Sequence, residues 1–396
     1  MNILPEVVKE KDYLVSVKRH LHKNPELSLK EFSTATYIEE QLESMGINYR
    51  RVGETGILGT ITGKNGNGKT VLLRADIDAL PVHEETAISY QSHNAGVMHA
   101  CGHDVHTASL LGAAKVLQSL RDTFAGQVLL VFQQAEEFGH GSKYFIEENI
   151  TESVDRALGL HVAPDFPVGT IAMVKGADAA SCDYFKITIQ GKDAHISKPN
   201  KGIDALYIAS LIACELKTLT ERLVNPSETA LIGVGKIISG SSYNIIAGSA
   251  ILEGTIRTFS SKTQNLLQLK LAEVASHIAS YHGGVAITEI ETFTSALIND
   301  DTAFDEVYEV AEKIVGDDNI VTDPALITGL GSDDFAEYIQ DTKGVYVHIG
   351  TSNNDPSTKH PLHSSKFNID EMALLIAASL HVKYILSILG YSDYVI

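Results

Sequence analysis

The order of helix and strand patterns changes once along this chain, near residue 180. Before that point, helical periodicity alternates with short buried-strand patterns such as residues 127–133 (QVLLVFQ) and 156–161 (RALGLH). From Tyr184 to Thr292 the order becomes strand, helix, strand, strand, helix, strand. The first pattern predicts an α/β fold with a mainly parallel sheet and helices on both faces. The second is the β-α-β-β-α-β order of a ferredoxin-like domain.

The alternation of helices and strands resumes after Phe293 and ends with a long helical pattern from Ile369 to about Leu389. A chain of 396 residues is longer than one hydrophobic core usually organises. We therefore expect two domains. Residues 1–178 and 293–396 should form the first, and residues 179–292 a second domain inserted into it.

Charge and composition exclude several classes of partner. The chain has 31 Lys and Arg residues against 50 Asp and Glu residues, a formal net charge of −19 that disfavours nucleic acid. Its start lacks a basic stretch followed by an apolar core, and no segment has the apolar length of a membrane span. We expect a cytoplasmic protein with no membrane partner. Three cysteines at unrelated spacings argue against a disulfide framework.

The segment MHACGHDVH, residues 98–106, holds the densest group of metal-binding residue types, placed where a loop leads into a helix. Cys101 and His103 can face one site from an extended segment, and both are favoured ligands of zinc and similar ions. A loop whose cysteine packs inward while its histidines meet solvent explains this segment equally well.

A second candidate is the pair Glu136 and Glu137, which follows the strand pattern of residues 127–133. Neighbouring residues on an extended chain point in opposite directions, so one carboxylate can bind a metal while the other reaches a water. The pattern does not say which residue has which role. An isolated Glu-Glu pair would be a solvated acidic turn.

Further candidates follow other strand patterns. His161 ends RALGLH, Asp78 follows the strand in RADIDALP, and the loop KHPLHSS supplies His363. Ligand sites in α/β sheets collect at the carboxyl ends of strands, so we expect Asp78, Glu137 and His161 to share one site. Asp76 lies two residues before Asp78 and has a structural alternative, an ion pair with Arg74 or another basic group.

The chain resembles the two-metal aminoacylase and carboxypeptidase superfamily, in particular the branch of hippurate hydrolases, auxin-conjugate amidohydrolases and N-acetyldiaminopimelate deacetylases. The resemblance is nearly chain-long. Its motifs are RHLHKNPELSLKEFSTATYI, LLRADIDALPVHEET, MHACGHDVHTASLLGAA, VFQQAEEFGHGSK, LGLHVAPDFPVGTI, GKDAHISKPNKGIDAL, NIIAGSAILEGTIRTF, GSDDFAEY and PLHSSKFNIDE.

This resemblance implies a general base at Glu136 and two divalent metal ions per subunit, zinc or manganese first, nickel or cobalt as alternatives. It implies metal ligands at Cys101, His103, Glu137, His161 and His363. Cys101 would bridge the metals, with His103 and His161 on one and Glu137 and His363 on the other. Other branches carry a carboxylate in place of Cys101, and His-x-Asp in place of Asp76-Ile77-Asp78. Asp78 would therefore orient the site, while Asp76 does not inherit the ligand role of that histidine.

The inserted domain supplies further residues through the same resemblance. It would act as a lid and as the surface of a homodimer, and residues 1–178 with 293–396 as the catalytic domain. Substrate-binding roles would fall to His195, Asn244 and Arg257. A histidine can stabilise an oxyanion, and an arginine can hold a carboxylate with two hydrogen bonds. Arg257 has an equal alternative as an exposed strand charge.

The predicted function is metal-dependent hydrolysis of the amide bond of N-acyl amino acids, with Glu136 taking a proton from the attacking water. A dipeptidase or carboxypeptidase on the same centre is the alternative within enzymes. A non-enzymatic metal-binding or peptide-binding module is the alternative outside catalysis, and it would require Glu136 to be dispensable.

Residues 63–70, GKNGNGKT, match the phosphate-loop pattern of nucleotide-binding proteins. A functional phosphate loop opens a helix, whereas TVLLRAD here is a strand pattern. We predict a polar turn between two strands.

Overall fold

A computed structural model describes residues 1–390 of the chain and divides it into two compact units. Of the described residues, unit 1 comprises Met1–Asp178, Ile298–Thr328 and residues 333–390. Unit 2 comprises Ala179–Leu297 and Gly329–Ser332. The sequence prediction placed its two boundaries after residues 178 and 292. The units divide after residues 178 and 297, and the short stretch 329–332 packs with unit 2 although it comes later in the chain.

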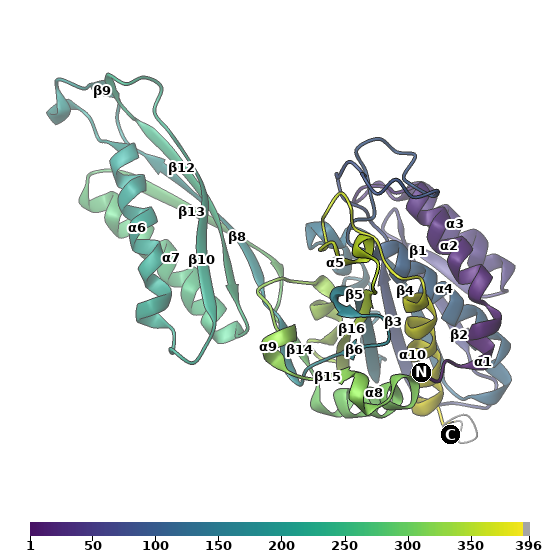
Figure 1. The fold of residues 1–396 in the computed structure, drawn as a ribbon. Helices are drawn as coiled ribbons and strands as arrows, with labels where there is room; N and C mark the ends of the chain where they lie inside the picture. Colours follow the sequence, from purple (N-terminus) through teal and green to yellow (C-terminus); the bar gives the residue numbers. More distant parts are fainter. Residues whose placement is uncertain (391–396) are drawn as a thin grey trace. The chain divides into compact units, whose positions relative to one another are not determined.

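Unit 1 is built on an eight-stranded sheet whose centre is parallel (Figure 1). Strands β4, β3, β5 and β16 lie next to one another in that order and pair in parallel. The β1–β2, β2–β4 and β16–β6 pairs are antiparallel, and β6–β15 is parallel. In sheet order the strands are β1 (Asn48–Val52), β2 (Gly56–Thr62), β4 (Gln127–Gln133), β3 (Thr70–Asp76), β5 (Arg156–Pro167), β16 (Gly344–Ser352), β6 (Ile171–Ala172) and β15 (Ile320–Val321). The predicted α/β class is confirmed.

One face of this sheet forms the main hydrophobic core. Successive strand residues alternate between faces, and Leu73, Leu158 and Val347 belong to the fully buried set on the core face. Helices pack on this face, and their buried apolar residues, most numerous in α4 and α10, supply much of the core. The helices of unit 1 are α1 (Pro5–Lys9), α2 (Lys11–Lys23), α3 (Phe32–Ser44), α4 (His103–Ser119), α5 (Gly141–Ile146), α8 (Asp301–Val315), α9 (Pro324–Ile327) and α10 (Met372–Ile388).

The opposite face of the sheet carries polar groups. Arg74, Gly159 and Tyr346 lie on it, and the ring of Phe335 packs 5.6 Å from the ring of Tyr346. Gly159 leaves room for this packing, because a Cβ there would lie 2.9 Å from the Phe335 ring. Phe335 belongs to the 3-10 helix η5 (Asp334–Ile339). The sheet therefore has an apolar face and a polar face, and the functional candidates collect at the polar one.

Three local features of unit 1 are less regular than a simple alternation of helices and strands. The apolar run from Ile3 to His22 is two helices, which meet at Glu10. Residues 334–339 form the 3-10 helix η5 and no α-helix, and the side chain of Asp333 accepts the backbone N–H of Phe335 at 2.7 Å. β2 and β3 do not pair with each other, since β4 lies between them.

Residues 63–70 run from the end of β2 to the start of β3, and no helix follows them. The phosphate-loop interpretation therefore lacks the helix N-terminus it requires.

Unit 2 is a four-stranded antiparallel sheet in the order β10-β12-β8-β13 with two helices against one face (Figure 1). Asp204 and Ser260 cap these helices by accepting backbone N–H groups. In chain order the elements are β8 (Cys182–Gln190), α6 (Ala205–Leu223), β10 (Ala230–Ser239), β12 (Ser249–Thr258), α7 (Ser261–Tyr281) and β13 (Val285–Thr294). This is the predicted ferredoxin-like order.

Candidate metal centre

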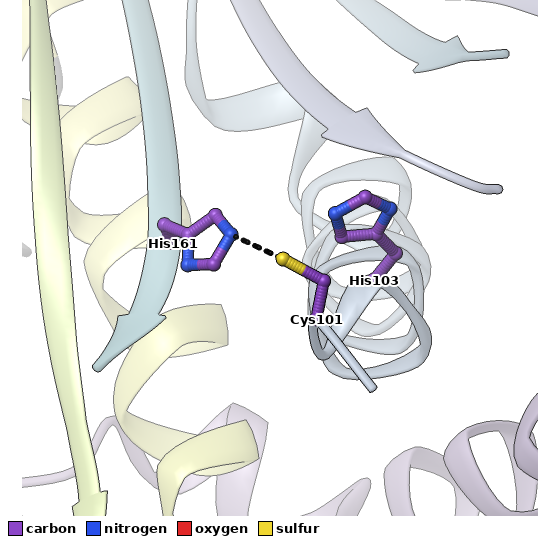
Figure 2. Close-up of side chains that lie close together, drawn as sticks. All are labelled: Cys101, His103 and His161. Atoms are coloured by element: carbon purple, nitrogen blue, oxygen red, sulfur yellow. Dashed lines mark hydrogen bonds between the residues drawn. The ribbon is translucent and has the colours of Figure 1, made fainter. Parts of the chain in front are cut away.

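Cys101, His103 and His161 form the first group of candidate metal ligands (Figure 2). Cys101 lies just before α4, His103 is the first residue of α4, and His161 lies on β5. Their ligand atoms all lie within 4.8 Å of one another, and Cys101 Sγ is 3.4 Å from His161 Nε2. Gly102 makes this approach possible. Its φ of +86° is left-handed, and a Cβ there would lie 2.4 Å from a methyl of Val162.

Asp78 fixes the ring of His103. His103 Nδ1 lies 2.9 Å from the carbonyl oxygen of Asp78 and 3.2 Å from its carboxylate Oδ1. Both partners are acceptors, so Nδ1 must carry the proton and Nε2 presents its lone pair to the site. The second carboxylate oxygen of Asp78 accepts the Ser28 hydroxyl at 2.7 Å and the Glu137 N–H at 3.1 Å. Asp78 thus joins one ligand to the backbone of another.

The tautomer of His161 is fixed in the same way. Its Nδ1 donates to the carbonyl oxygen of Val162 at 2.7 Å, which leaves Nε2 facing Cys101. Burial lowers the pKa of His161 well below its usual value, and the neighbouring His106 adds to this effect. The ring is therefore neutral, the form that binds metal.

Cys101 also belongs to a second group, with Glu137 and His363, whose ligand atoms lie within 4.8 Å of one another. His363 Nε2 is 3.5 Å from Glu137 Oε1. The backbone of His363 has a φ of +64°, and its N–H donates to the carbonyl of Ala100 at 2.8 Å. Because Cys101 occurs in both groups, the geometry fits a thiolate shared by two metal positions.

Unpartnered buried atoms support a cation at this place. Within residues 1–390, His103 Nε2 and Glu137 Oε1 are buried without a hydrogen-bond partner. Such atoms are costly unless a ligand satisfies them. The nearby Cys101 and Glu137 side chains raise the pKa of His363 to about 10, so the protein groups attract positive charge here. The donors present therefore fit divalent metal ions, which satisfy nitrogen, sulfur and oxygen ligands together.

Glu136 lies beside this centre on the turn that follows β4. Its carboxylate Oε2 is 3.9 Å from His103 Nε2, and its side chain is 12% exposed. Glu136 also groups with Asp333 and Asp334, the ligand atoms of the three lying within 4.8 Å. Burial, with the charges of Asp333 and Glu137, holds the pKa of Glu136 well above its usual range. A carboxyl group with a raised pKa suits proton transfer.

Asp76 is held by other partners. Its Oδ2 accepts Arg74 Nη1 at 2.7 Å and its Oδ1 lies 2.6 Å from His106 Nδ1. His106 Nε2 accepts the N–H of Val162 at 3.0 Å, so both ring nitrogens of His106 are engaged. The ion pair with Arg74 offered as the alternative for Asp76 is present. Asp76 and His106 also lie next to the candidate ligands, since Asp76 Oδ2 is 3.6 Å from His103 Nε2 and the rings of His106 and His161 are 4.6 Å apart.

The predicted substrate-binding residues all lie in unit 2. His195 on β9 (Ala194–His195) pairs with Ile245 on β11 (Ile245–Ile246), directly after Asn244. His195 is exposed, and its Nδ1 accepts the N–H of Ser197 at 3.2 Å. The structure thus brings Asn244 close to His195, at the end of this small sheet, where the N–H of Ile196 donates to the carbonyl of Asn244 at 3.0 Å.

Arg257 lies apart from that small sheet, on β12. Its Nη1 donates to Ser332 Oγ at 3.0 Å and to the carbonyl of Leu330 at 3.3 Å. It is therefore a partly buried anchor of the segment 329–332 and not the exposed strand charge considered as its alternative.

Sequence reasoning missed the supporting residues Ser28, Gln133 and Asp334. Ser28 holds Asp78, and Gln133 and Asp334 bind each other and Arg74. One signal was present: Arg74 and Gln133 are polar residues within otherwise apolar buried strands. Polar residues at core positions must find partners and often mark a site.

At the polar end of the parallel sheet, two groups of candidate ligands share one cysteine, and a glutamate lies beside them. This arrangement defines a metal-dependent hydrolase. The model of the family described as "Peptidase family M20/M25/M40" matches residues 72–387 of the chain. The chain therefore belongs to this family. It is 38% identical over 366 residues to N-acetyl-L-cysteine deacetylase of Bacillus subtilis, covering 92% of this chain and 85% of the relative.

Two further relatives fit the same class. Thermostable carboxypeptidase 2 of Saccharolobus solfataricus is 37% identical, covering 94% of this chain and 95% of the relative. The Bacillus subtilis YXEP protein, described as a dinuclear metal binding peptidase from the M20 family, superposes with a TM-score of 0.83 at 31% identity. That match covers 97% of this chain and 99% of the other. The predicted family and the predicted hydrolase class are confirmed.

Within residues 1–390, no helix has both the length and the apolar character needed to cross a membrane.

Proposed function

We propose that this protein removes the acyl group from N-acyl amino acids by hydrolysing their amide bond. One observation carries the proposal: Glu136 lies beside two ligand groups that share Cys101. The deacetylase relative in Bacillus subtilis supports the choice of an N-acyl amino acid as substrate. The proposed ligands are Cys101, His103 and His161 for one metal ion, and Cys101, Glu137 and His363 for the other.

Bound divalent ions would supply Lewis acidity, which acidifies a water molecule and polarises an amide carbonyl. Residues of the chain supply the proton transfer and the positioning of the ligands. Glu136 accepts a proton from the attacking water and later passes it to the departing amine nitrogen. Asp78 keeps His103 in the tautomer that presents Nε2. The apolar core behind β5 and α4 holds Cys101, His103 and His161 in a fixed arrangement.

Several finer assignments belong to the proposal. We assign zinc or manganese to the centre, because thiolate, imidazole and carboxylate ligands together suit such ions, with nickel or cobalt as alternatives. Unit 1 is the catalytic domain and unit 2 a lid, through which a cytoplasmic homodimer forms. His195, Asn244 and Arg257 of unit 2 bind the substrate.

A carboxypeptidase or dipeptidase is the second candidate, and the Saccharolobus carboxypeptidase relative favours it. The metal-loaded protein should be assayed on N-acetyl amino acids and on unblocked dipeptides at equal concentrations. Higher kcat/KM on the acetylated compounds supports the deacylase. Faster cleavage of the dipeptides assigns the chain to the second candidate.

The role of Glu136 is tested with Glu136→Gln, which keeps the size of the side chain and removes its basicity. We expect kcat to fall about 100-fold or more, with the metal content unchanged. A variant that retains its metal and hydrolyses at the wild-type rate would show that Glu136 is not the base. Activity that survives complete chelation would overturn the metal-dependent mechanism.

A further inference from the structure

The turn that carries Glu136 and Glu137 is closed at its base. It spans residues 134–141, between the end of β4 and the start of α5, and we call it the Glu136 turn. Its two ends touch, since a Cβ added to Gly141 would lie 1.6 Å from the carbonyl oxygen of Gln134. Its interior is left-handed at Ala135, with a φ of +52°, and at Gly139, with a φ of +63°. A turn of this shape needs partners that hold its two ends together.

Asp334 bonds to the residues that flank the turn on either side. Its Oδ1 and Oδ2 accept Gln133 Nε2 at 2.7 and 2.9 Å, and its Oδ2 also accepts the backbone N–H of Ser142 at 2.9 Å. Gln133 precedes the turn and Ser142 follows it. All three side chains are completely buried. A single carboxylate from a distant part of the chain thus joins both ends of the turn.

Arg74 also holds the side chain of Asp334 in place. Its Nη2 donates to Asp334 Oδ1 at 2.8 Å, and its Nε donates to Gln133 Oε1 at 3.0 Å. Arg74, Gln133 and Asp334 therefore form a closed triangle of hydrogen bonds. The triangle also fixes the amide of Gln133, whose oxygen must face the arginine and whose nitrogen must face the carboxylate. Buried bonds of this kind to charged groups are strong and directional.

The remaining backbone of the turn is bound to neighbouring side chains. The N–H of Ala135 donates to Glu31 at 2.9 Å, and the N–H of Glu137 donates to Asp78 at 3.1 Å. Asp78 also holds His103. The same residue therefore contacts the turn and orients a candidate ligand. Glu136 itself lies within the 4.8 Å group that includes Asp334.

We propose that Asp334, anchored by Arg74, is a positioning residue that sets the Glu136 turn against the metal ligands. This inference rests on the proposed function, because it gives Asp334 its effect through Glu136. The competing explanation is a buried ion pair that only stabilises unit 1. The two explanations differ because the bonds of Asp334 go to the two residues that flank the turn.

Asp334→Asn tests the inference. The amide keeps its size and its bond to Arg74, but its NH2 group faces the N–H of Ser142, so one end of the turn is released. Asp333→Asn is the matched control, because Asp333 is also paired with Arg74 and grouped with Glu136 but bonds the N–H of Phe335. Both variants replace a carboxyl group beside the same arginine with an amide of the same size.

Hydrogen exchange gives a readout that does not depend on catalysis. We expect the amides of residues 134–142 to exchange at least about tenfold faster in Asp334→Asn than in Asp333→Asn, with equal metal content. In N-acetyl amino acid hydrolysis, kcat should fall about 10- to 100-fold in Asp334→Asn with little change in KM, and less in Asp333→Asn. Unchanged protection of residues 134–142 in folded Asp334→Asn overturns the inference. So do equal kcat losses in the two variants.

Gln133→Met provides a second route if Asp334→Asn does not fold. It removes the hydrogen bonds of Gln133 to Arg74 and Asp334 and leaves the bonds from Arg74 and Ser142 to Asp334. We expect faster hydrogen exchange that is confined to residues 134–142. A lower melting temperature with unchanged exchange of these residues contradicts the inference. A wild-type protein that hydrolyses no N-acyl amino acid refutes the proposed function, while the exchange measurement still decides whether Asp334 holds the turn.

Discussion

The ring N–H of His103 donates to two oxygen atoms of Asp78, the main-chain carbonyl at 2.9 Å and the carboxylate Oδ1 at 3.2 Å. This double contact fixes both the tautomer and the plane of the ring. The other carboxylate oxygen of Asp78 accepts the backbone N–H of Glu137. Asp78 therefore holds one ligand of each candidate metal position. Supporting residues of this kind tune metal affinity almost as strongly as the ligands do.

Asp78→Asn should therefore weaken metal binding about 10- to 100-fold. The amide provides one acceptor where the carboxylate provides two, and the charge that favours the protonated Nδ1 is lost. Competition with a chelating dye measures the affinity. Ser28→Ala is the control, because it removes one bond to Asp78 and leaves the carboxylate in place. An Asp78→Asn protein with wild-type affinity would contradict this role.

Cys101→Ala should lower the metal content of the purified protein from two ions to one or none per subunit, since the geometry places this sulfur in both ligand groups. Elemental analysis of dialysed protein measures the ratio. Cys214→Ala is the control, because Cys214 is a free and exposed cysteine of unit 2. Full occupancy without Cys101 would show that the thiolate does not bridge the two positions.

Gly102→Ala should disrupt the centre although it changes no ligand. The left-handed φ of +86° disfavours any side chain, and the new methyl would meet Val162 at 2.4 Å. We expect a loss of metal affinity of at least about tenfold and a lower melting temperature. Gly96→Ala separates the two causes. Gly96 has a similar φ of +77°, but nothing lies within 4 Å of its added Cβ. Equal metal affinities in the two variants would argue against the steric explanation.

His381 should make unit 1 less stable in mild acid. Its ring is fully buried in α10, and within residues 1–390 neither ring nitrogen has a hydrogen-bond partner. Burial, together with His106, lowers the pKa of His381 to about 3. An unfolded histidine titrates near pH 6.5, so between these pH values the unfolded chain binds a proton that the folded protein does not. Stability is then lost as the pH falls below about 6.5, by up to about 1.4 kcal/mol per pH unit.

His381→Leu should remove this contribution. Urea unfolding of the variant and the wild type at pH 7, 6 and 5 gives the free energy of unfolding of each protein as a function of pH. The contribution of the carboxylates is common to both proteins and cancels in the difference between the two slopes. His277→Gln, at an exposed position on α7, is the control. A variant that keeps the full wild-type pH dependence would show that His381 is not its source.

Part of the candidate centre could be predicted because the residue types and their chain positions follow simple physical rules. Glu137 and His161 lie on or directly after buried parallel strands, and such strands end at one edge of a sheet. The change of pattern near residue 180 also identified the ferredoxin-like unit, since strand and helix periodicities are local properties of the chain. What the sequence by itself determined is therefore the fold class of each unit and the set of candidate ligands.

The tertiary structure decided which atoms face one another. The sequence left the partners of Asp76 open, with Arg74 or another basic group as one alternative. In the structure β3 ends at Asp76, which binds Arg74 and His106, while Asp78 turns to His103. The contact between Gln133 and Asp334 joins residues 201 positions apart. Hydrogen bonds form only within about 3.5 Å and at favourable angles. The sequence pattern sets the face on which a side chain lies, but the packing of distant segments sets its partner.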